Sequence, residues 1–283
     1  MADQAQYEFE SIGTRWWCEM LDDSVFSPAI IHDIAVICDE FDRRYSRFRD
    51  DSLVAELART GVLVNPPEEL LRMLDFAHEM EQVSEGAFTI AVGPALHRLG
   101  YGARTHGGTV RKSIWEDITY DTQKVTIPKG VMLDFGGQGK GWLIDRLADV
   151  FRQHGVKQFI INGGGDLFVQ SDAPVELALE DPYDASKMVG KVMLTTGALA
   201  ASSTLRRTWR SETGDHHHII DPVTGQSSKT GIAASFVTAP TALVADTMAT
   251  ILILRPELEA TLAARYRLQT KLLRMSNGSS LQR

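Results

Sequence analysis

Residues 134–141, Asp-Phe-Gly-Gly-Gln-Gly-Lys-Gly, are the segment whose composition points most directly to chemistry. They separate a run rich in β-forming residues, 124–133, from a run with apolar residues at helical spacing, 142–151. Glycines let backbone N–H groups approach an anion, and a following helix N-terminus adds unpaired donors. A phosphate-bearing ligand fits these properties. A tight strand-to-helix turn explains them equally well, and the segment matches neither the Walker pattern nor Gly-x-Gly-x-x-Gly.

A second candidate site lies in residues 242–254, an almost wholly apolar run that predicts a helix buried on all sides. Asp246 and Thr250 are four residues apart, so their oxygen atoms share one face of this helix. A buried carboxylate is costly unless it is paired or bound to metal. Carboxylate and hydroxyl oxygens suit Mg²⁺ or another divalent cation. We therefore expect a metal site, with a capping Asp and a back-bonded Thr as the structural alternative.

Three glycines end the next predicted strand. Residues 159–162 have the apolar character of a buried strand, and Gly163-Gly164-Gly165-Asp166 follows it. Successive glycines at such a corner indicate backbone packed closely against a ligand or another backbone. For Asp166, stabilisation of the turn is favoured over contact with a ligand.

Three consecutive histidines, 216–218, precede the segment Ile219-Ile220-Asp221-Pro222. Consecutive strand residues point to opposite faces, so at most two of the three imidazoles could share a metal ion. His218 is the better candidate for acid–base or ligand-contact chemistry. His216 and His217 are expected to be loop residues.

Helical patterns and strand patterns both occur among the segments that must position these groups. Helical patterns occupy residues 27–45, 67–84 and 256–265, and strand patterns occupy 115–127, 175–179, 191–194 and 235–238. No repeat and no strong linker interrupts them. We expect an α+β fold with helices packed on largely antiparallel sheets, forming one compact unit with two lobes.

Composition agrees with an ordinary globular enzyme. The 283 residues are 43% hydrophobic and 23% charged, and the net charge of −8 disfavours nucleic acid or an anionic membrane as partner. No apolar run reaches the ~18 residues of a membrane span. The first eight residues lack the basic and apolar regions of a signal peptide. We expect a cytoplasmic protein, with a periplasmic or lipid-anchored one only if an export signal has been removed.

In this order, the segments resemble the ApbE-type FAD:protein FMN transferases over most of the chain. Six or more motifs in one order make chance similarity improbable. The matching segments are Phe9–Thr14, Phe41–Ser52, Glu85–Pro94 with Leu99–Gly102, the glycine-rich segment 134–141, the Asn162–Asp166 corner, His218–Gly225 and Ala245–Thr250.

The resemblance implies roles for individual residues. Asp246, Thr250 and the carbonyl of Gly137 would bind the divalent cation. His218 would be the base near the incoming hydroxyl, and Asp246 is counted with it as catalytic. The residues placed beside FAD are Ile12, Ser46, Arg47, Phe48, Thr89, Lys140 and Ile220.

Three positions depart from the family pattern. Ile12 replaces a Met, Thr89 replaces an Asp that contacts FAD, and residues 200–204 lack the usual glycine. These departures affect the expected flavin contacts and leave the expected metal ligands intact.

The implied unit is a single ApbE-like, T-fold-like domain over residues 1–275, followed by a flexible tail at 276–283. The implied reaction is Mg²⁺-dependent transfer of FMN from FAD to a Thr or Ser hydroxyl of an acceptor protein, releasing AMP. An FAD pyrophosphatase that forms FMN and AMP, and a flavin-binding protein without turnover, are the alternatives.

Overall fold

A seven-stranded antiparallel sheet organises the computed structural model, which describes residues 5–101, 113–211 and 214–275. The strand order is β1-β2-β6-β7-β8-β13-β14, and the neighbouring pairs are all antiparallel. The strands are β1 (Gln6–Ser11), β2 (Thr14–Met20), β6 (Phe159–Gly163), β7 (Asp166–Glu180), β8 (Met188–Ser203), β13 (Ile232–Ala239) and β14 (Gln269–Arg274).

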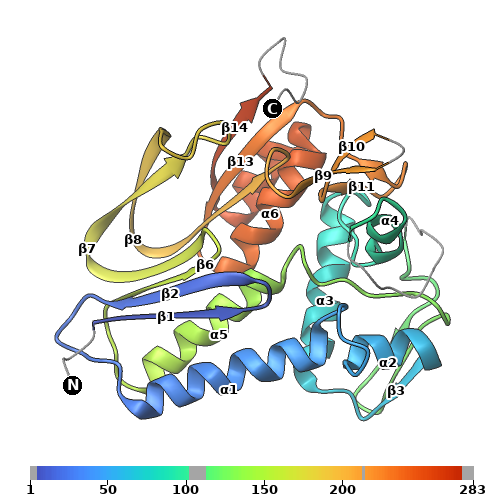
Figure 1. Ribbon diagram of the computed structural model, residues 1–283, viewed down its shortest axis with the longest axis horizontal. Coiled ribbons are helices and arrows are strands. Elements are labelled where there is room, and N and C mark those ends of the chain that lie inside the picture. The colour runs from blue at the N-terminus through green and yellow to red at the C-terminus, as the bar shows by residue number, and fades with distance from the viewer. Residues whose placement is uncertain (1–4, 102–112, 212–213, 276–283) are drawn as a thin grey trace.

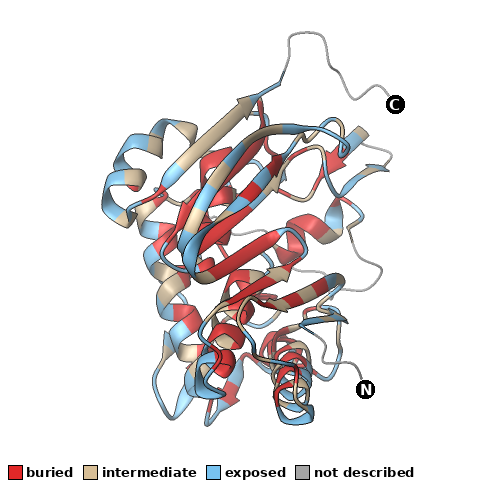
Figure 2. Ribbon diagram, turned by 90° about the vertical axis from the view of Figure 1, so that its left-hand side faces the viewer, coloured by how far each residue is buried: buried red, intermediate tan, exposed pale blue. Residues whose placement is uncertain are grey.

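Helices cover one face of this sheet (Figure 1). The helices that pack there are α1 (Pro28–Tyr45), α5 (Gly139–Gln153) and α6 (Ala242–Leu254). Helices α2 (Leu53–Thr60), α3 (Glu68–Val83) and α4 (Gly93–Arg98) lie beside the sheet (Figure 1), and the short 3₁₀ helix η1 (Pro256–Leu258) and α7 (Glu259–Tyr266) follow α6. Alternate strand side chains, including Phe159 and Phe168, enter the main hydrophobic core with buried residues of α1, α5 and α6. Figure 2 shows these buried residues along the strands and the helices.

The opposite face of the sheet carries a second hydrophobic cluster. Leu167, Val169 and Leu199 alternate with the core residues of the same strands and pack there with Leu177 and Leu179 from the far half of β7. The β7–β8 pairing shifts register between Gln170 and Val175, and the hairpin bends along its length (Figure 1).

Three small sheets complete the described chain. One contains β3 (Val62–Val64), β5 (Lys124–Thr126) and β4 (Thr119–Tyr120); the others pair β9 (Thr208–Ser211) with β10 (Gly214–His217) and β11 (Ile220–Asp221) with β12 (Gln226–Ser227).

The predicted α+β class with largely antiparallel sheets is confirmed. The buried helix at 242–254 is also confirmed, since most of α6 is enclosed. Within the described residues, no helix is long and apolar enough to cross a membrane. The predicted flexible tail, 276–283, lies outside the described residues.

Two local expectations were wrong. The strand-like run of β-forming residues at 124–133 pairs as a strand only over Lys124–Thr126. Pro128 has no N–H for a ladder, and Gly130 turns the backbone at φ +83°, so the glycine-rich segment enters α5 from a loop. His216 and His217 are strand residues of β10 and buried, since β10 pairs with β9.

Candidate active site

One cavity of about 1270 Å³ is lined by every residue to which the family resemblance assigned a role. It is bounded by the β1–β2 turn, the segment after α1, the glycine-rich segment before α5 and one side of α6. The predicted residues that line it are Ile12, Ser46, Arg47, Phe48, Thr89, Gly137, Lys140, His218, Ile220, Asp246 and Thr250. Residues up to 238 positions apart in the chain therefore border a single space.

The crossing of α5 and α6 forms one wall of the cavity. Gly141 is required there, because a Cβ at this position would lie 2.3 Å from the carbonyl oxygen of Ala242. At this close approach the N–H of Gly141 donates to Asp246 Oδ2 at 3.0 Å. Asp246 therefore caps the N-terminus of α5, whereas the structural alternative raised from the sequence was a cap on its own helix.

Asp145 of α5 caps α6 in return. Its two carboxylate oxygens accept the N–H groups of Ala242 at 2.8 Å and Leu243 at 2.9 Å. Burial raises the pKa of Asp145 to about 6, although these two hydrogen bonds favour the charged form. The two helices thus hold each other through a carboxylate at each N-terminus.

Three buried charged groups meet where α5, α6 and β7 converge. The ammonium of Lys140 donates to Asp246 Oδ1 at 2.8 Å and also to the carboxylate of Asp166. Burial disfavours this ammonium, but the two carboxylates outweigh burial and raise the pKa of Lys140. Burial also raises the pKa of Asp166 to about 6, against the opposing effect of Lys140. The sequence favoured a turn-stabilising role for Asp166, whereas the structure pairs it with a cavity residue.

The predicted metal ligands of α6, Asp246 and Thr250, both line the cavity. Thr250 lies one turn after Asp246, and its Oγ1 is 3.1 Å from Ser202 Oγ of β8. The positively charged ammonium of Lys140 already forms an ion pair with Asp246. Within the described residues, no three His, Cys, Asp or Glu side chains gather into a metal-binding group. This donor set suits Mg²⁺, which commonly uses one or two carboxylates together with water and substrate phosphates.

Arg47 presents unpaired donors at the other side of the cavity. Its Nε pairs with Asp134 Oδ2 at 2.7 Å, and the guanidinium lies 4.1 Å from the centre of the Phe48 ring. The two terminal nitrogens are buried without a hydrogen-bond partner. Buried donors of this kind are costly unless a ligand satisfies them.

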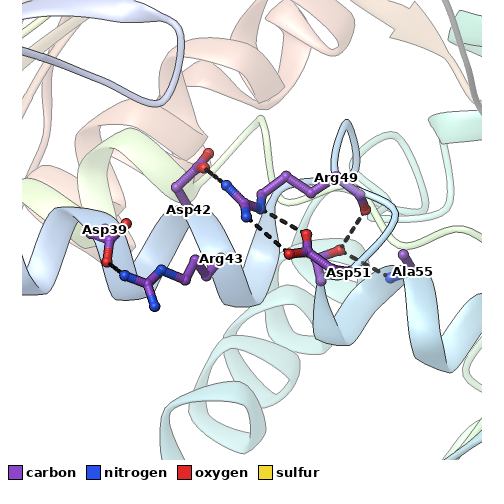
Figure 3. A network of polar contacts seen from close by, with 7 residues as sticks. Asp39, Asp42, Arg43, Arg49, Asp51 and Ala55 are labelled. Carbon is purple, nitrogen blue, oxygen red and sulfur yellow. Dashed lines mark hydrogen bonds and ion pairs between the residues drawn. The ribbon is translucent and has the colours of Figure 1, made fainter.

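A charged network holds the segment that carries Arg47. Arg49 bonds to Asp51 at 3.0 Å and to Asp42 of α1 at 3.2 Å (Figure 3). Ser52 caps α2 by accepting the N–H of Ala55. The turn between α1 and α2 is thus fixed at both ends, which orients Arg47 towards its partners.

His218 is the histidine of the triplet that borders the cavity. Burial, followed by the charge of Arg207, lowers its pKa to about 3. The ring bonds to the backbone of Arg206, and Nδ1 has no hydrogen-bond partner. The imidazole is therefore neutral at physiological pH. His217 instead bonds to the carbonyl of Ser228 at 3.1 Å, which indicates a structural role.

The β1–β2 turn brings Ile12 to the cavity in an unusual conformation. Ile12 and Gly13 have φ values of +41° and +73°, the left-handed pair that a two-residue hairpin needs. A β-branched residue rarely adopts this conformation. The turn also packs on the second glycine corner, since a Cβ at Gly164 would lie 2.5 Å from Thr14 Oγ1. The predicted close approach to another backbone is present at that corner, since the N–H of Gly164 donates to the carbonyl oxygen of Arg15 at 3.1 Å.

The remaining predicted residues differ in surroundings. Thr89 is 6% exposed, and its hydroxyl accepts the N–H of Ala91 at 3.2 Å. Phe48 is 59% exposed at the cavity wall, whereas Ile220 is 4% exposed. Gly137 lines the cavity, and the role of its carbonyl stays a prediction.

The sequence did not assign roles to Asp134 and Ser202, which contact Arg47 and Thr250. Asp134 is the first residue of the glycine-rich segment, and this position in the motif could have identified it as a site residue. Ser202 lies in segment 200–204, which the family resemblance had singled out, but its contact with Thr250 depends on where β8 lies against α6.

Comparisons with known proteins agree with this arrangement. A sequence model of the ApbE family, described as "ApbE family", matches residues 12–272. The FAD:protein FMN transferase of Haemophilus influenzae is 26% identical over 271 residues, which covers 85% of this chain and 78% of that protein. The FAD:protein FMN transferase of Treponema pallidum is 25% identical over 255 residues, covering 78% and 70% respectively.

Solved structures show the same fold. The ApbE protein of Thermotoga maritima superposes with a TM-score of 0.80 at 19% identity and covers 96% of each chain. The flavin transferase ApbE of Vibrio cholerae superposes with a TM-score of 0.79 at 21% identity, covering 96% of this chain and 94% of that one.

Proposed function

The chain belongs to the ApbE family, and from this membership we propose that it transfers FMN from FAD to a Thr or Ser hydroxyl of an acceptor protein, releasing AMP. The observation that carries the proposal is the cavity in which Asp246 and Thr250 of α6 lie with Lys140, Arg47 and His218. Phosphoryl transfer from an anionic dinucleotide needs groups of these kinds: a pair of oxygen ligands for a metal ion, cationic donors for the phosphates and a neutral imidazole as base.

The reaction breaks the phosphoanhydride bond of FAD and forms a phosphoester bond to the acceptor. The acceptor oxygen bonds to the phosphorus on the FMN side of the pyrophosphate, and the bond from that phosphorus to the bridging oxygen breaks. AMP leaves with the bridging oxygen, and the hydroxyl proton passes to a base. Because water can replace the hydroxyl, the same groups would also support hydrolysis of FAD to FMN and AMP.

Asp246 and Thr250 would hold Mg²⁺, with the Gly137 carbonyl as a further ligand. When bound, the ion supplies neutralisation of phosphate charge and polarisation of phosphorus. The protein's own contribution is to orient Asp246, because the N–H of Gly141 donates to Oδ2 of its carboxylate.

Arg47 would provide the second anchor for the anionic part of FAD. Its terminal guanidinium nitrogens have no protein partner, and the ion pair with Asp134 fixes the plane of the group. A planar guanidinium with two free donors suits bidentate contact with a phosphate. Phe48 and Ile12 add apolar surface to the cavity for the flavin or adenine ring.

His218 would accept the proton of the attacking hydroxyl. A neutral ring with an unpartnered Nδ1 is in the form that can act as a base. Its low pKa reflects burial near cationic groups, and a bound pyrophosphate would raise that pKa because negative charge favours the imidazolium. Proton uptake by His218 is then coupled to the presence of FAD.

One assay tests the function. The protein is incubated with FAD and Mg²⁺, with and without an acceptor protein, and both AMP and covalently bound flavin are measured. The proposal predicts AMP in step with flavinylated acceptor. AMP release that is independent of acceptor would identify a pyrophosphatase, and FAD binding without AMP would identify a non-catalytic flavin-binding protein.

His218→Asn separates the role of the base from that of a binding residue. General-base help amounts to ~10²–10⁴-fold, so FMN transfer should slow by that factor while FAD affinity changes little. Hydrolysis should fall less, since water can approach phosphorus from other directions. An equal fall in both rates, with a matching loss of FAD affinity, would instead make His218 a support of the flavin site.

A further inference from the structure

Lys140 occupies the position on Asp246 that a metal ion would require. Its ammonium is 2.8 Å from Asp246 Oδ1, and the other carboxylate oxygen already accepts the N–H of Gly141. A divalent cation that binds Asp246 would therefore meet a second positive charge at hydrogen-bond distance. Like charges this close disfavour each other strongly in a buried site.

Asp166 pairs with the same Lys140 ammonium, but from the side away from the cavity. Lys140 and Asp246 line the cavity, whereas Asp166 is absent from its lining and is 2% exposed. Asp166 is fixed independently of Lys140, because its Oδ1 accepts the N–H of Ala201 at 3.1 Å. A cation arriving through the cavity would reach Asp246 first and leave the Lys140–Asp166 pair in place.

We propose that Lys140 is an internal cation that occupies the metal position on Asp246, that a divalent ion displaces it, and that Asp166 keeps the displaced ammonium paired. This inference rests on the metal site of the proposed function. It makes Asp166 a positioning residue that acts through Lys140. Each of the two carboxylates is then paired with a positive charge in both states, so neither state leaves an unpaired buried charge.

Displacement of the Lys140 ammonium from Asp246 also gives it a second role, in binding FAD. Once released from Asp246, the ammonium remains at the cavity wall, where it can contact the phosphates of FAD. Removal of Lys140 should therefore have opposite effects on two ligands: tighter binding of the metal alone, and weaker binding of FAD in the presence of metal. A residue that only supports the fold would weaken both.

The first test measures Mn²⁺ binding to the FAD-free protein by titration calorimetry. Lys140→Gln should bind Mn²⁺ at least about tenfold more tightly, because the competing charge is gone. The same variant should bind FAD with Mn²⁺ about tenfold more weakly. Lys157→Gln, which removes an exposed lysine, is the matched control and should leave both affinities within twofold. Asp166→Asn should weaken Mn²⁺ binding about tenfold, since the displaced ammonium loses its partner.

The second test uses the wild-type chain, so it does not depend on how a variant folds. Acetylation of lysines by acetic anhydride is quantified by mass spectrometry with and without Mn²⁺. Labelling of Lys140 relative to Lys157 should rise severalfold when Mn²⁺ binds. Unchanged labelling, or a Lys140→Gln variant with Mn²⁺ affinity within threefold of wild type, would overturn the inference.

Asp246→Ala distinguishes this inference from the proposed function. If Asp246→Ala binds Mn²⁺ as well as the wild type, the metal site itself is misplaced, and the failure belongs to the proposed function. If Asp246→Ala abolishes Mn²⁺ binding but Lys140→Gln does not tighten it, the metal site stands and the displacement of Lys140 is refuted.

Discussion

Replacement of Gly141 by alanine should separate the two helices that form the site. The new Cβ would lie 2.3 Å from the carbonyl oxygen of Ala242, 2.6 Å from its carbonyl carbon and 2.7 Å from the Cα of Leu243. All three atoms belong to the backbone, so no side chain can rotate away. Non-bonded carbon atoms pack at about 3.5–4.0 Å, and the helices must therefore move apart by roughly 1 Å.

The cost follows from what that movement breaks. Overpacking of a tight contact costs about 1–3 kcal/mol. Loss of the 3.0 Å hydrogen bond from Gly141 to the Asp246 carboxylate adds about 1.5–3 kcal/mol. Alanine regains up to about 1 kcal/mol of helix propensity. The net loss should be about 2–5 kcal/mol, which lowers the melting temperature by roughly 3–8 °C for a chain of this size.

Gly139→Ala is the matched control in the same helical turn. Its Cβ would meet the Phe41 ring at 3.5 Å, an ordinary contact, so its stability should be unchanged or slightly higher. Thermal unfolding followed by circular dichroism compares the two variants with the wild type. The reasoning is refuted if Gly141→Ala melts within 2 °C of wild type, or if Gly139→Ala loses as much stability.

Five further substitutions test individual groups. Asp246→Ala should abolish FMN transfer with the fold retained, whereas Thr250→Val, which removes one neutral ligand, should be milder in the AMP-release assay. Arg47→Met should weaken FAD binding by about 10–100-fold in fluorescence titration, since hydrogen bonds to charged groups contribute about 1.5–3 kcal/mol; unchanged affinity would place the phosphates elsewhere. Thr89→Asp should tighten FAD binding by roughly tenfold or less, because a carboxylate accepts hydrogen bonds more strongly than a hydroxyl, and weaker binding would show that this loop does not contact the flavin. The pKa of Asp145 is about 6 in the folded state, above the unfolded value of about 3.9. Between these two pH values the folded state binds more protons than the unfolded state. The free energy of unfolding should therefore fall by up to about 3 kcal/mol as the pH rises from 4 to 6. Asp145→Asn should flatten that part of the stability–pH curve, and an unchanged curve would exclude Asp145 as its source.

Local patterns in the sequence were sufficient to predict the main helices and strands and part of the site. The helical period places Asp246 and Thr250 on one face, because residues four apart are neighbours on any α-helix. The apolar run around them predicts burial, and α6 is buried. Glycine clusters predicted close backbone contacts, which are found at Gly141 and Gly164. These inferences need only information within a few residues of each position.

Only the tertiary structure decided which charges meet. Lys140, Asp166 and Asp246 come from three separate elements, and their contact depends on how α5 crosses α6 beside the first residue of β7. The sequence likewise did not indicate that Asp246 caps α5 and that Asp145 caps α6, since a cap normally lies on the helix it serves. A carboxylate finds its partner through sheet order and helix packing, and these long-range relations have no periodic signature in the chain.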